Sequence, residues 1–177
     1  TNYSFDYWND RSEESGKEFD ISDGNNQKLI DYLNKSGLRH QYQIAESIIK
    51  DQWKNDSELT ICDLACGTGW TSALLSRLPF TSKVYAVEFS KHRLYELFPE
   101  TCKALGGIED LIQRCYGSFY TLGLEDSSVD IVFMSQAFHH AEKPLELINE
   151  CGRVLAPGGV VTLIGEHRIG AIRLIKR

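Results

Sequence analysis

The stretch that decides the fold is LTICDLACGTGW, residues 59–70. Its first half, Leu59–Leu64, is a short apolar run of the kind that forms a strand buried on both faces. Its second half carries Gly67 and Gly69, where the backbone can turn tightly without a Cβ and then open a helix whose first N–H groups face a ligand. A buried strand, a glycine turn and a helix in this order predict one unit of a parallel α/β sheet.

The same alternation continues downstream. Further strands are expected at Val84–Phe89, near Leu111–Cys115, at Val129–Met134 and at Val160–Ile164, with helices over 70–78, 91–105 and 145–155. Because apolar strands alternate with helices, the predicted fold class is α/β, a doubly wound, Rossmann-like parallel sheet. Ligands bind to such sheets beyond the carboxyl ends of the strands. The chain ends soon after the fifth strand, so we expect a truncated core with an open apolar edge.

The region before the sheet differs in character. Residues 1–57 are expected to form an N-terminal aromatic segment followed by helices, and residues 58–177 the α/β core. The first 24 residues carry five aromatic rings, Tyr7 and Trp8 among them, which is too many for a solvated tail. We expect this segment to act as a lid that closes over a bound ligand.

Hydrophobic spacing predicts which helix faces are buried. Two helices are expected over 26–36 and 38–54, and in the second Ile44, Ile48 and Ile49 fall at helical spacing. In the helix over 145–155 the expected apolar face comprises Leu145, Ile148, Cys151 and Leu155.

Composition argues against several classes of protein. The 177 residues include 19 Lys and Arg against 25 Asp and Glu, a formal net charge of −6, and no dense basic stripe indicates a nucleic-acid partner. No window approaches the roughly 20 apolar residues that span a bilayer. Five cysteines without a Cys-x-x-Cys pair indicate reduced thiols and no metal site, and a cytoplasmic location is expected.

Acidic residues end the first two strands. Asp63 would repel a pyrophosphate but suits a ligand with an ammonium group, and the turn after it lacks the Gly-x-Gly-x-x-Gly fingerprint of a nicotinamide dinucleotide site. Glu88 lies 19 residues past Gly69, where an acid can accept hydrogen bonds from both hydroxyls of a ribose. These residues favour a ligand with a ribose and an ammonium group over a dinucleotide.

With DLACGTGW at 63–70, the acid in VYAVEFS at 84–90 and the stretch 115–159, the chain resembles the class I S-adenosylmethionine-dependent methyltransferases. It is most similar to the branch associated with ubiquinone and menaquinone biosynthesis, and the resemblance covers about residues 59–166. It implies S-adenosylmethionine as the cofactor and methyl transfer to a small-molecule acceptor.

The resemblance also implies which residues hold the cofactor. They are Asp63, Ala65, Cys66, Gly67, Gly69, Glu88, Phe89, Ser118, Phe119, Ser135 and Gln136. The glycine turn and the pair after the fourth strand would hold the methionine end, Glu88 the ribose, and Phe89 the adenine. Ser118 stands where the family often has an Asp that accepts from the adenine amino group, and a neutral hydroxyl makes a weaker bond.

Phe138, His139 and His140 follow the fourth strand. A histidine at the mouth of a methyl-transfer site can take a proton from an oxygen or nitrogen nucleophile near neutral pH. The alternative is that both histidines only shape the loop, since the family carries such a pair across many substrates. Glu166, after the fifth strand, also points to the substrate side.

Two other functions stay open at this point. A non-catalytic domain that binds S-adenosylmethionine is favoured by Ser118 and by the short C-terminal part, whereas an NAD(P)-dependent oxidoreductase is disfavoured by Asp63 and by the missing fingerprint. We also expect either that the natural protein continues past Arg177 with two more strands, or that the apolar edge at Val160–Ile164 is covered in a homodimer or by the tail 168–177.

Overall fold

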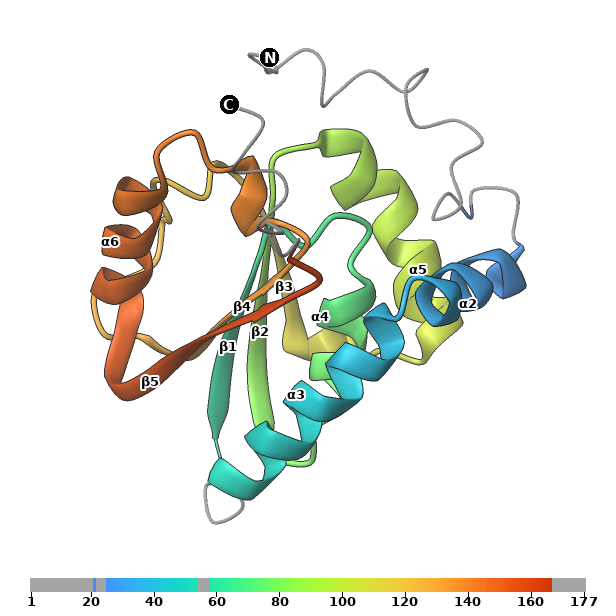
Figure 1. Cartoon of the computed structure of the whole chain (residues 1–177), viewed down its shortest axis with the longest axis horizontal. Coiled ribbons are helices and arrows are strands. Elements are labelled where there is room, and N and C mark those ends of the chain that lie inside the picture. The colour runs from blue at the N-terminus through green and yellow to red at the C-terminus, as the bar shows by residue number, and fades with distance from the viewer. Residues whose placement is uncertain (1–20, 22–24, 54–57, 167–177) are drawn as a thin grey trace, which may run out of the picture.

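The computed structural model describes residue 21, residues 25–53 and residues 58–166. Within these ranges five parallel strands form one sheet in the order β3-β2-β1-β4-β5 (Figure 1). The strands are β1 (Leu59–Leu64), β2 (Thr81–Glu88), β3 (Ile112–Tyr116), β4 (Val129–Ser135) and β5 (Leu155–Ile164). The predicted doubly wound, Rossmann-like fold class is confirmed.

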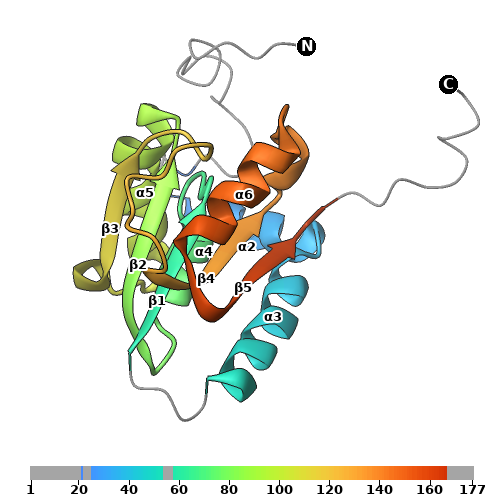
Figure 2. The same ribbon diagram turned by 90° about the vertical axis from the view of Figure 1, so that its left-hand side faces the viewer.

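Helices cover both faces of the sheet. They are α2 (Asn26–Lys35), α3 (Leu38–Gln52), α4 (Trp70–Leu75), the π-helix η2 (Arg93–Leu97), α5 (Phe98–Leu105), the short 3₁₀ helices η3 (Glu109–Leu111) and η4 (Phe138–His140), and α6 (Pro144–Val154). Figure 1 shows α6 on one side of the sheet and α2, α3, α4 and α5 on the other, and in Figure 2 α6 lies in front of the sheet. None of the helices in the described ranges is long and apolar enough to cross a membrane.

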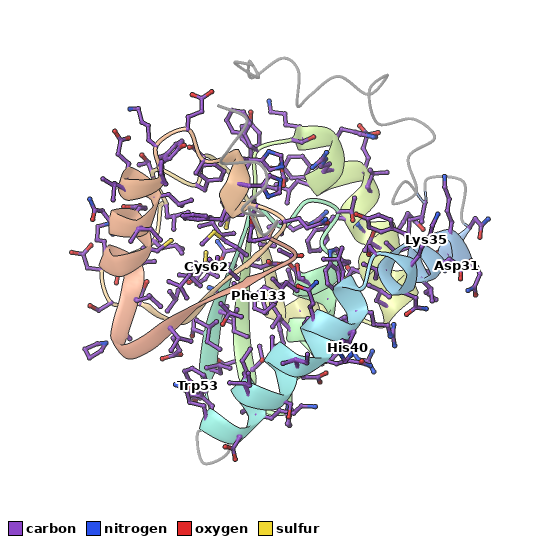
Figure 3. All side chains as sticks on the ribbon, in the orientation of Figure 1. Asp31, Lys35, His40, Trp53, Cys62 and Phe133 are labelled. Atoms are coloured by element: carbon purple, nitrogen blue, oxygen red, sulfur yellow. The ribbon has the colours of Figure 1, made fainter. Side chains whose placement is uncertain are left out.

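Alternate residues of the strands enter two separate hydrophobic layers, as the two-residue period of a strand requires. Leu59 and Ile61 pack with residues of α2 to α5, whereas Cys62 and Leu64 pack with residues of α6. Phe133 of β4 lies on the α3 side of the sheet (Figure 3). Because the helices α2 and α3 share this layer with β1 and β4, they belong to the packing of the core.

The buried face of α3 differs from the one that the spacing predicted. Ile44 and Ile48 are 50% and 60% exposed, and of the three isoleucines only Ile49 is buried. The buried residues of α3 are Leu38, Tyr42, Ala45 and Ile49. The sheet selects this stripe because the Tyr42 ring packs against Phe133, with 6.1 Å between the ring centroids. Outward-facing residues of α2 and α3, such as His40, point away from the sheet (Figure 3).

The expected apolar face of α6 is correct for Cys151 and wrong for Leu145 and Ile148. Leu145 is 78% exposed and Ile148 is 42% exposed, whereas the helix buries Leu147, Cys151 and Val154. Leu155 has already left the helix and pairs with Val129, so β5 begins earlier than the predicted Val160. Pro157-Gly158-Gly159 therefore lies inside β5, where the register against β4 shifts, rather than between two elements.

Among the described residues β5 is an outer strand of the sheet, as expected. Its apolar side chains are partly covered: Val161 and Leu163 remain 37% and 42% exposed. The tail 168–177, which was expected to cover this edge, and the aromatic segment 1–20, which was expected to act as a lid, lie outside the described residues. The lid, the covered edge and the homodimer stay predictions.

Candidate functional site

A cavity of about 670 Å³ opens at the carboxyl ends of β1, β2 and β4. Its volume lies within the ~300–1,000 Å³ that small-molecule and cofactor sites typically have. The cavity is lined by Tyr32, Ala65, Cys66, Gly67, Thr68, Trp70, Val87, Glu88, Phe89, Arg93, Gly117, Ser118, Phe119, Tyr120, Ser135, Gln136, Ala137, His139, His140, Ala141 and Glu142. Of the residues predicted to bind a cofactor, all but Asp63 and Gly69 line it, and both histidines do so as well.

Two non-glycine residues at the cavity have left-handed backbones. Ala65 directly follows β1 and has φ 55°, and Gln136 directly follows β4 and has φ 53°. This conformation costs on the order of 1–2 kcal/mol for a residue with a Cβ. Two hydrogen bonds hold Gln136 in this conformation. Its N–H donates to the Ile164 carbonyl at 2.9 Å, and the Tyr32 hydroxyl donates to its Oε1 at 3.2 Å. Strain of this kind concentrates at functional sites.

The two glycines of the turn have different surroundings. Gly67 has φ 58°, lies at the cavity, and its N–H donates to Glu88. Gly69 has φ 82° and begins α4, and a Cβ built on it would lie 2.1 Å from the Phe98 ring of α5. Gly69 therefore lets α5 approach the turn closely, and its role at the cofactor stays a prediction.

Glu88 ties the second strand to the glycine turn. Its Oε2 accepts from the Gly67 N–H at 2.8 Å, and its Oε1 accepts from the N–H groups of Phe89 and Ser90, each at 2.8 Å. A carboxylate offers about four acceptor positions. Three of them are taken by the backbone, so one position, on Oε2, is left for a ligand hydroxyl. The predicted bond to a ribose fits here for one hydroxyl, while the second would require one of the backbone bonds to open.

Asp63 lies beneath the turn, fully buried. Its Oδ2 accepts from the hydroxyls of Thr71 (2.6 Å) and Ser72, both on α4, whereas its Oδ1 has no hydrogen-bond partner among the described residues. Burial raises the pKa of this carboxyl to about 6, against the opposing hydroxyl bonds and with a small contribution from the charge of Glu88. A buried carboxylate oxygen without a donor is costly, and an ammonium group would satisfy it.

Aromatic residues from the segment after β3, together with Phe89, line the cavity. Phe119 and Tyr120 pack edge to face, with 4.6 Å between the ring centroids, and Phe89 lines the same cavity. The Ser118 hydroxyl accepts from the Tyr120 N–H at 3.2 Å, so this serine orders the aromatic turn in addition to facing the cavity. Flat faces of this kind suit the stacking of a purine or of another planar ligand.

Glu166, shortly after β5, organises the histidine loop. Its Oε1 accepts from the N–H groups of Ala137 (3.0 Å) and Phe138 (2.9 Å). Its Oε2 accepts from the His139 N–H (3.2 Å) and lies 2.9 Å from His139 Nδ1. Partial burial would raise the pKa of Glu166, but the bonds from His139 and from the backbone of Phe138 outweigh it and hold that pKa below the ordinary value.

Sequence reasoning missed several residues of the cavity. Tyr32 comes from α2, far from the sheet in sequence, and Trp70 opens α4 behind the glycine turn. Arg93 begins the π-helix η2, a type of irregularity that often marks functional sites. No local sequence pattern identifies Tyr32. Arg93 follows Glu88 closely, so its position near the end of β2 could have indicated that it lies at the cavity. In the described ranges no three His, Cys, Asp or Glu side chains gather as a metal ion would require.

Comparison with known proteins agrees with this geometry. The family model of the methyltransferase domain matches residues 62–163, more than half of the chain. The chain belongs to this family. The predicted resemblance to class I S-adenosylmethionine-dependent methyltransferases of the quinone-biosynthesis type is thereby confirmed.

Individual relatives cover only part of their own length. A demethylmenaquinone methyltransferase of Staphylococcus aureus is 28% identical over 139 residues, 77% of this chain and 55% of the relative. The chain thus spans about half the length of the curated relatives it matches. Among solved structures, a candidate S-adenosyl-L-methionine-dependent methyltransferase of Methanococcus maripaludis has a TM-score of 0.64 at 24% identity, covering 84% of this chain and 65% of that one.

The fold is shared with an enzyme of another kind. The cyclase SpnF has a TM-score of 0.57 at 18% identity, covering 67% of this chain and 43% of its own. A fold does not determine a reaction. The reaction of this chain therefore depends on the residues at its cavity.

Proposed function

We propose that this chain binds S-adenosylmethionine in the cavity and transfers its methyl group to a small-molecule acceptor. One observation carries the proposal: a single cavity brings the glycine turn after β1, Glu88 after β2 and the two histidines after β4 to the same place. Two polar groups that have no partner among the described residues support it: the Ser135 hydroxyl, which lies at the cavity, and the Asp63 Oδ1, which is buried beneath the glycine turn.

The residues present fit the cofactor. Glu88 has one acceptor position for a ribose hydroxyl, the rings of Phe89 and Phe119 suit the adenine, and Asp63 suits the ammonium group. When bound, the cofactor supplies an electrophilic methyl group on a positively charged sulfur. No acid is needed for its departure, so alignment of the acceptor and exclusion of water can provide most of the acceleration.

A planar aromatic acceptor is supported by the other walls of the cavity. Tyr32 and Tyr120 line it besides the residues assigned to the cofactor. Aromatic side chains of this kind bind flat, apolar rings with a polar edge. A quinone-type acceptor, such as the one in the name of the Staphylococcus aureus relative, has this shape.

The test is calorimetric titration of the purified chain with S-adenosylmethionine, with S-adenosylhomocysteine and with NAD, followed by tritium transfer from labelled cofactor to chemically reduced demethylmenaquinone. We expect micromolar dissociation constants for the first two ligands, about −8 kcal/mol, and no binding of NAD. Binding of NAD alone would overturn the proposal. Binding of S-adenosylmethionine without transfer to this or any other acceptor in a cell extract would favour the non-catalytic alternative.

Replacing Glu88 with alanine should weaken binding of S-adenosylhomocysteine by about 1–3 kcal/mol, because a hydrogen bond to a charged acceptor is lost. The variant should also melt at a lower temperature, since the N–H groups of Gly67, Phe89 and Ser90 lose their acceptor. Calorimetry and thermal melting separate the two effects, with Glu109→Ala, an exposed acid on η3, as the control. An E88A variant that binds as tightly as the parent would remove Glu88 from the ribose site.

A further inference from the structure

The segment between β3 and β4, residues 117–128, contains no helix and no strand. Its first part, residues 117–120, lines the cavity, and its later part runs beside α6 (Figure 1). A segment that packs against the core without regular structure needs partners from elsewhere for its backbone N–H and C=O groups. The position of the segment therefore depends on the side chains that supply these partners.

Arg153 on α6 binds this segment with its whole guanidinium group. Its Nη1 donates to the Leu124 carbonyl at 2.9 Å and to Asp126 Oδ1 at 2.6 Å. Its Nη2 donates to the Leu122 carbonyl at 3.0 Å and to Glu150 Oε1 at 2.7 Å, and its Nε donates to Glu150 Oε2 at 2.9 Å. All five N–H donors of a guanidinium are thus engaged, and the planar group joins the segment to α6.

Glu150 holds the other backbone group of Leu122. Its Oε1 accepts from the Leu122 N–H at 2.6 Å, so the Glu150–Arg153 pair binds both the N–H and the carbonyl of this residue. The side chains of Glu150 and Arg153 are 13% and 33% exposed. The hydrogen bonds from Arg153 hold the pKa of Glu150 below its ordinary value, so the carboxylate is charged at neutral pH. A bidentate, partly buried pair of this kind is stronger than an exposed one.

The same segment carries two aromatic rings of the cavity. Phe119 and Tyr120 pack edge to face, and the Tyr120 hydroxyl accepts from the Lys143 N–H at the start of α6, at 3.0 Å. Leu122, which the pair binds, follows Tyr120 by two residues and is 5% exposed in the layer between the sheet and α6. Neither member of the pair lines the cavity. Any effect of the pair on a ligand therefore passes through the segment.

Resting on the proposed binding of S-adenosylmethionine, we propose that Glu150 and Arg153 are positioning residues for the cofactor. They fix the segment on α6 so that the Phe119 ring already faces the adenine before the cofactor arrives. A wall that is ordered in advance loses less conformational freedom on binding, and the affinity rises without a new contact. The pair thus acts on the adenine end of the cofactor from outside the cavity.

The variants separate the shape of the guanidinium from its charge. Arg153→Lys keeps the charge but offers a compact ammonium in place of the planar group. Glu150→Gln keeps an oxygen that can accept from the Leu122 N–H and loses the charge. Glu146→Gln is the matched control, because Glu146 and Lys143 form an ion pair of the same three-residue spacing on α6, at 2.9 Å, with side chains that are 57% and 63% exposed.

The first readout is the calorimetric dissociation constant of S-adenosylhomocysteine, measured well below the melting temperature of each variant. We expect the constant to rise about 10-fold in Phe119→Ala, in line with the loss of an aromatic partner of a base. It should rise about fivefold in R153K and about threefold in E150Q, because the ring is displaced rather than removed. E146Q should bind as the parent does.

A double-variant cycle distinguishes positioning from a loss of stability. F119A/R153K should bind within about twofold of F119A, because that background has no ring for the pair to place and coupled residues are not additive. Urea unfolding reports the contribution to stability separately. If R153K does not fold, E150Q takes its place in the cycle. An effect of equal size in both backgrounds, or parent-like binding in both R153K and E150Q, would overturn the positioning role.

A parent chain that binds no S-adenosylhomocysteine contradicts the proposed function and not the pair. The pair is then decided by ¹³C NMR of the Phe119 and Tyr120 rings in the ligand-free protein. We expect the ring signals of E146Q to superimpose on those of the parent, and those of R153K to shift or broaden as the segment leaves α6. Ring signals that are unchanged in R153K would show that Arg153 does not position the aromatic rings.

Discussion

Gly69→Ala is expected to destabilise the fold by about 2–6 kcal/mol, the sum of the strain of a left-handed backbone and the overpacking of a filled core. The added methyl group would lie 2.1 Å from two carbons of the Phe98 ring. Phe98 is 2% exposed and belongs to the same buried cluster as residues of α4 and of the sheet, so it cannot move aside without opening the core. The glycine's φ of 82° adds a cost that no rearrangement of Phe98 relieves.

Gly67→Ala is the matched control. Its φ of 58° is also left-handed, but nothing lies within 4 Å of the Cβ that it would gain. We expect a cost of only about 1–2 kcal/mol. The measurement is the free energy of unfolding from urea titration of both variants and the parent. Equal losses in the two variants would show that Phe98 yields to the methyl group and that the packing role assigned to Gly69 is wrong.

Asp63→Asn is expected to act in opposite directions on stability and on cofactor binding. Burial raises the pKa of Asp63 to about 6 from its ordinary value of 3.8, so the folded protein binds its proton more tightly than the unfolded chain does. Below pH 4 the group costs the fold nothing. As the pH rises from about 4 to 6 the unfolded chain loses this proton while the folded protein still holds it, so the free energy of unfolding falls, and the loss levels off above pH 6.

The neutral amide removes that penalty. Above pH 6 the ligand-free D63N variant should be more stable than the parent by on the order of 1–3 kcal/mol, and the gain should vanish as the pH falls toward 4. If the amino acid end of the cofactor uses Asp63, binding of S-adenosylhomocysteine at pH 8 should weaken by about 2–5 kcal/mol, the usual result of truncating a buried charge pair. Binding by the parent should also weaken as the pH falls below 6.

Melting curves and calorimetry between pH 5 and 8 (roughly the window that brackets this pKa) measure both effects. The parent's loss of affinity at low pH should be absent in D63N, which has no group to protonate at that position. If D63N binds S-adenosylhomocysteine as tightly as the parent at pH 8, the Asp63 Oδ1 does not contact the ligand. A variant less stable than the parent above pH 6 would mean that the Thr71 and Ser72 hydroxyls need the carboxylate.

The elements around the cavity could be predicted from the sequence because their signals are local. β1 was predicted at its observed bounds, Leu59–Leu64, since a six-residue apolar run ahead of a glycine turn has few other uses in a parallel sheet. The position of Glu88 followed from the same logic, as strand ends of one sheet meet at one edge. The cavity brings the glycine turn after β1 together with Glu88.

Other features required the tertiary structure. Helical spacing alone offers more than one apolar stripe in α3 and α6, and only the sheet decides that Tyr42 and Leu147 are buried while Ile44 and Leu145 face outward. From the sequence, Gly67 and Gly69 were both predicted to bind the cofactor. What distinguishes them is the distance from each glycine to the Phe98 ring, which comes 29 residues after Gly69.

The sequence by itself determined the parallel sheet, the glycine turn and the acid at the end of the second strand, since each depends on residues adjacent in the chain. Only the tertiary structure decided that Tyr32 reaches Gln136 across 104 residues and that Glu166 meets His139 across 27. Contacts at such separations leave no periodic trace in a sequence. They exist because the sheet brings the carboxyl ends of β4 and β5, and the helix α2 beside them, to one place.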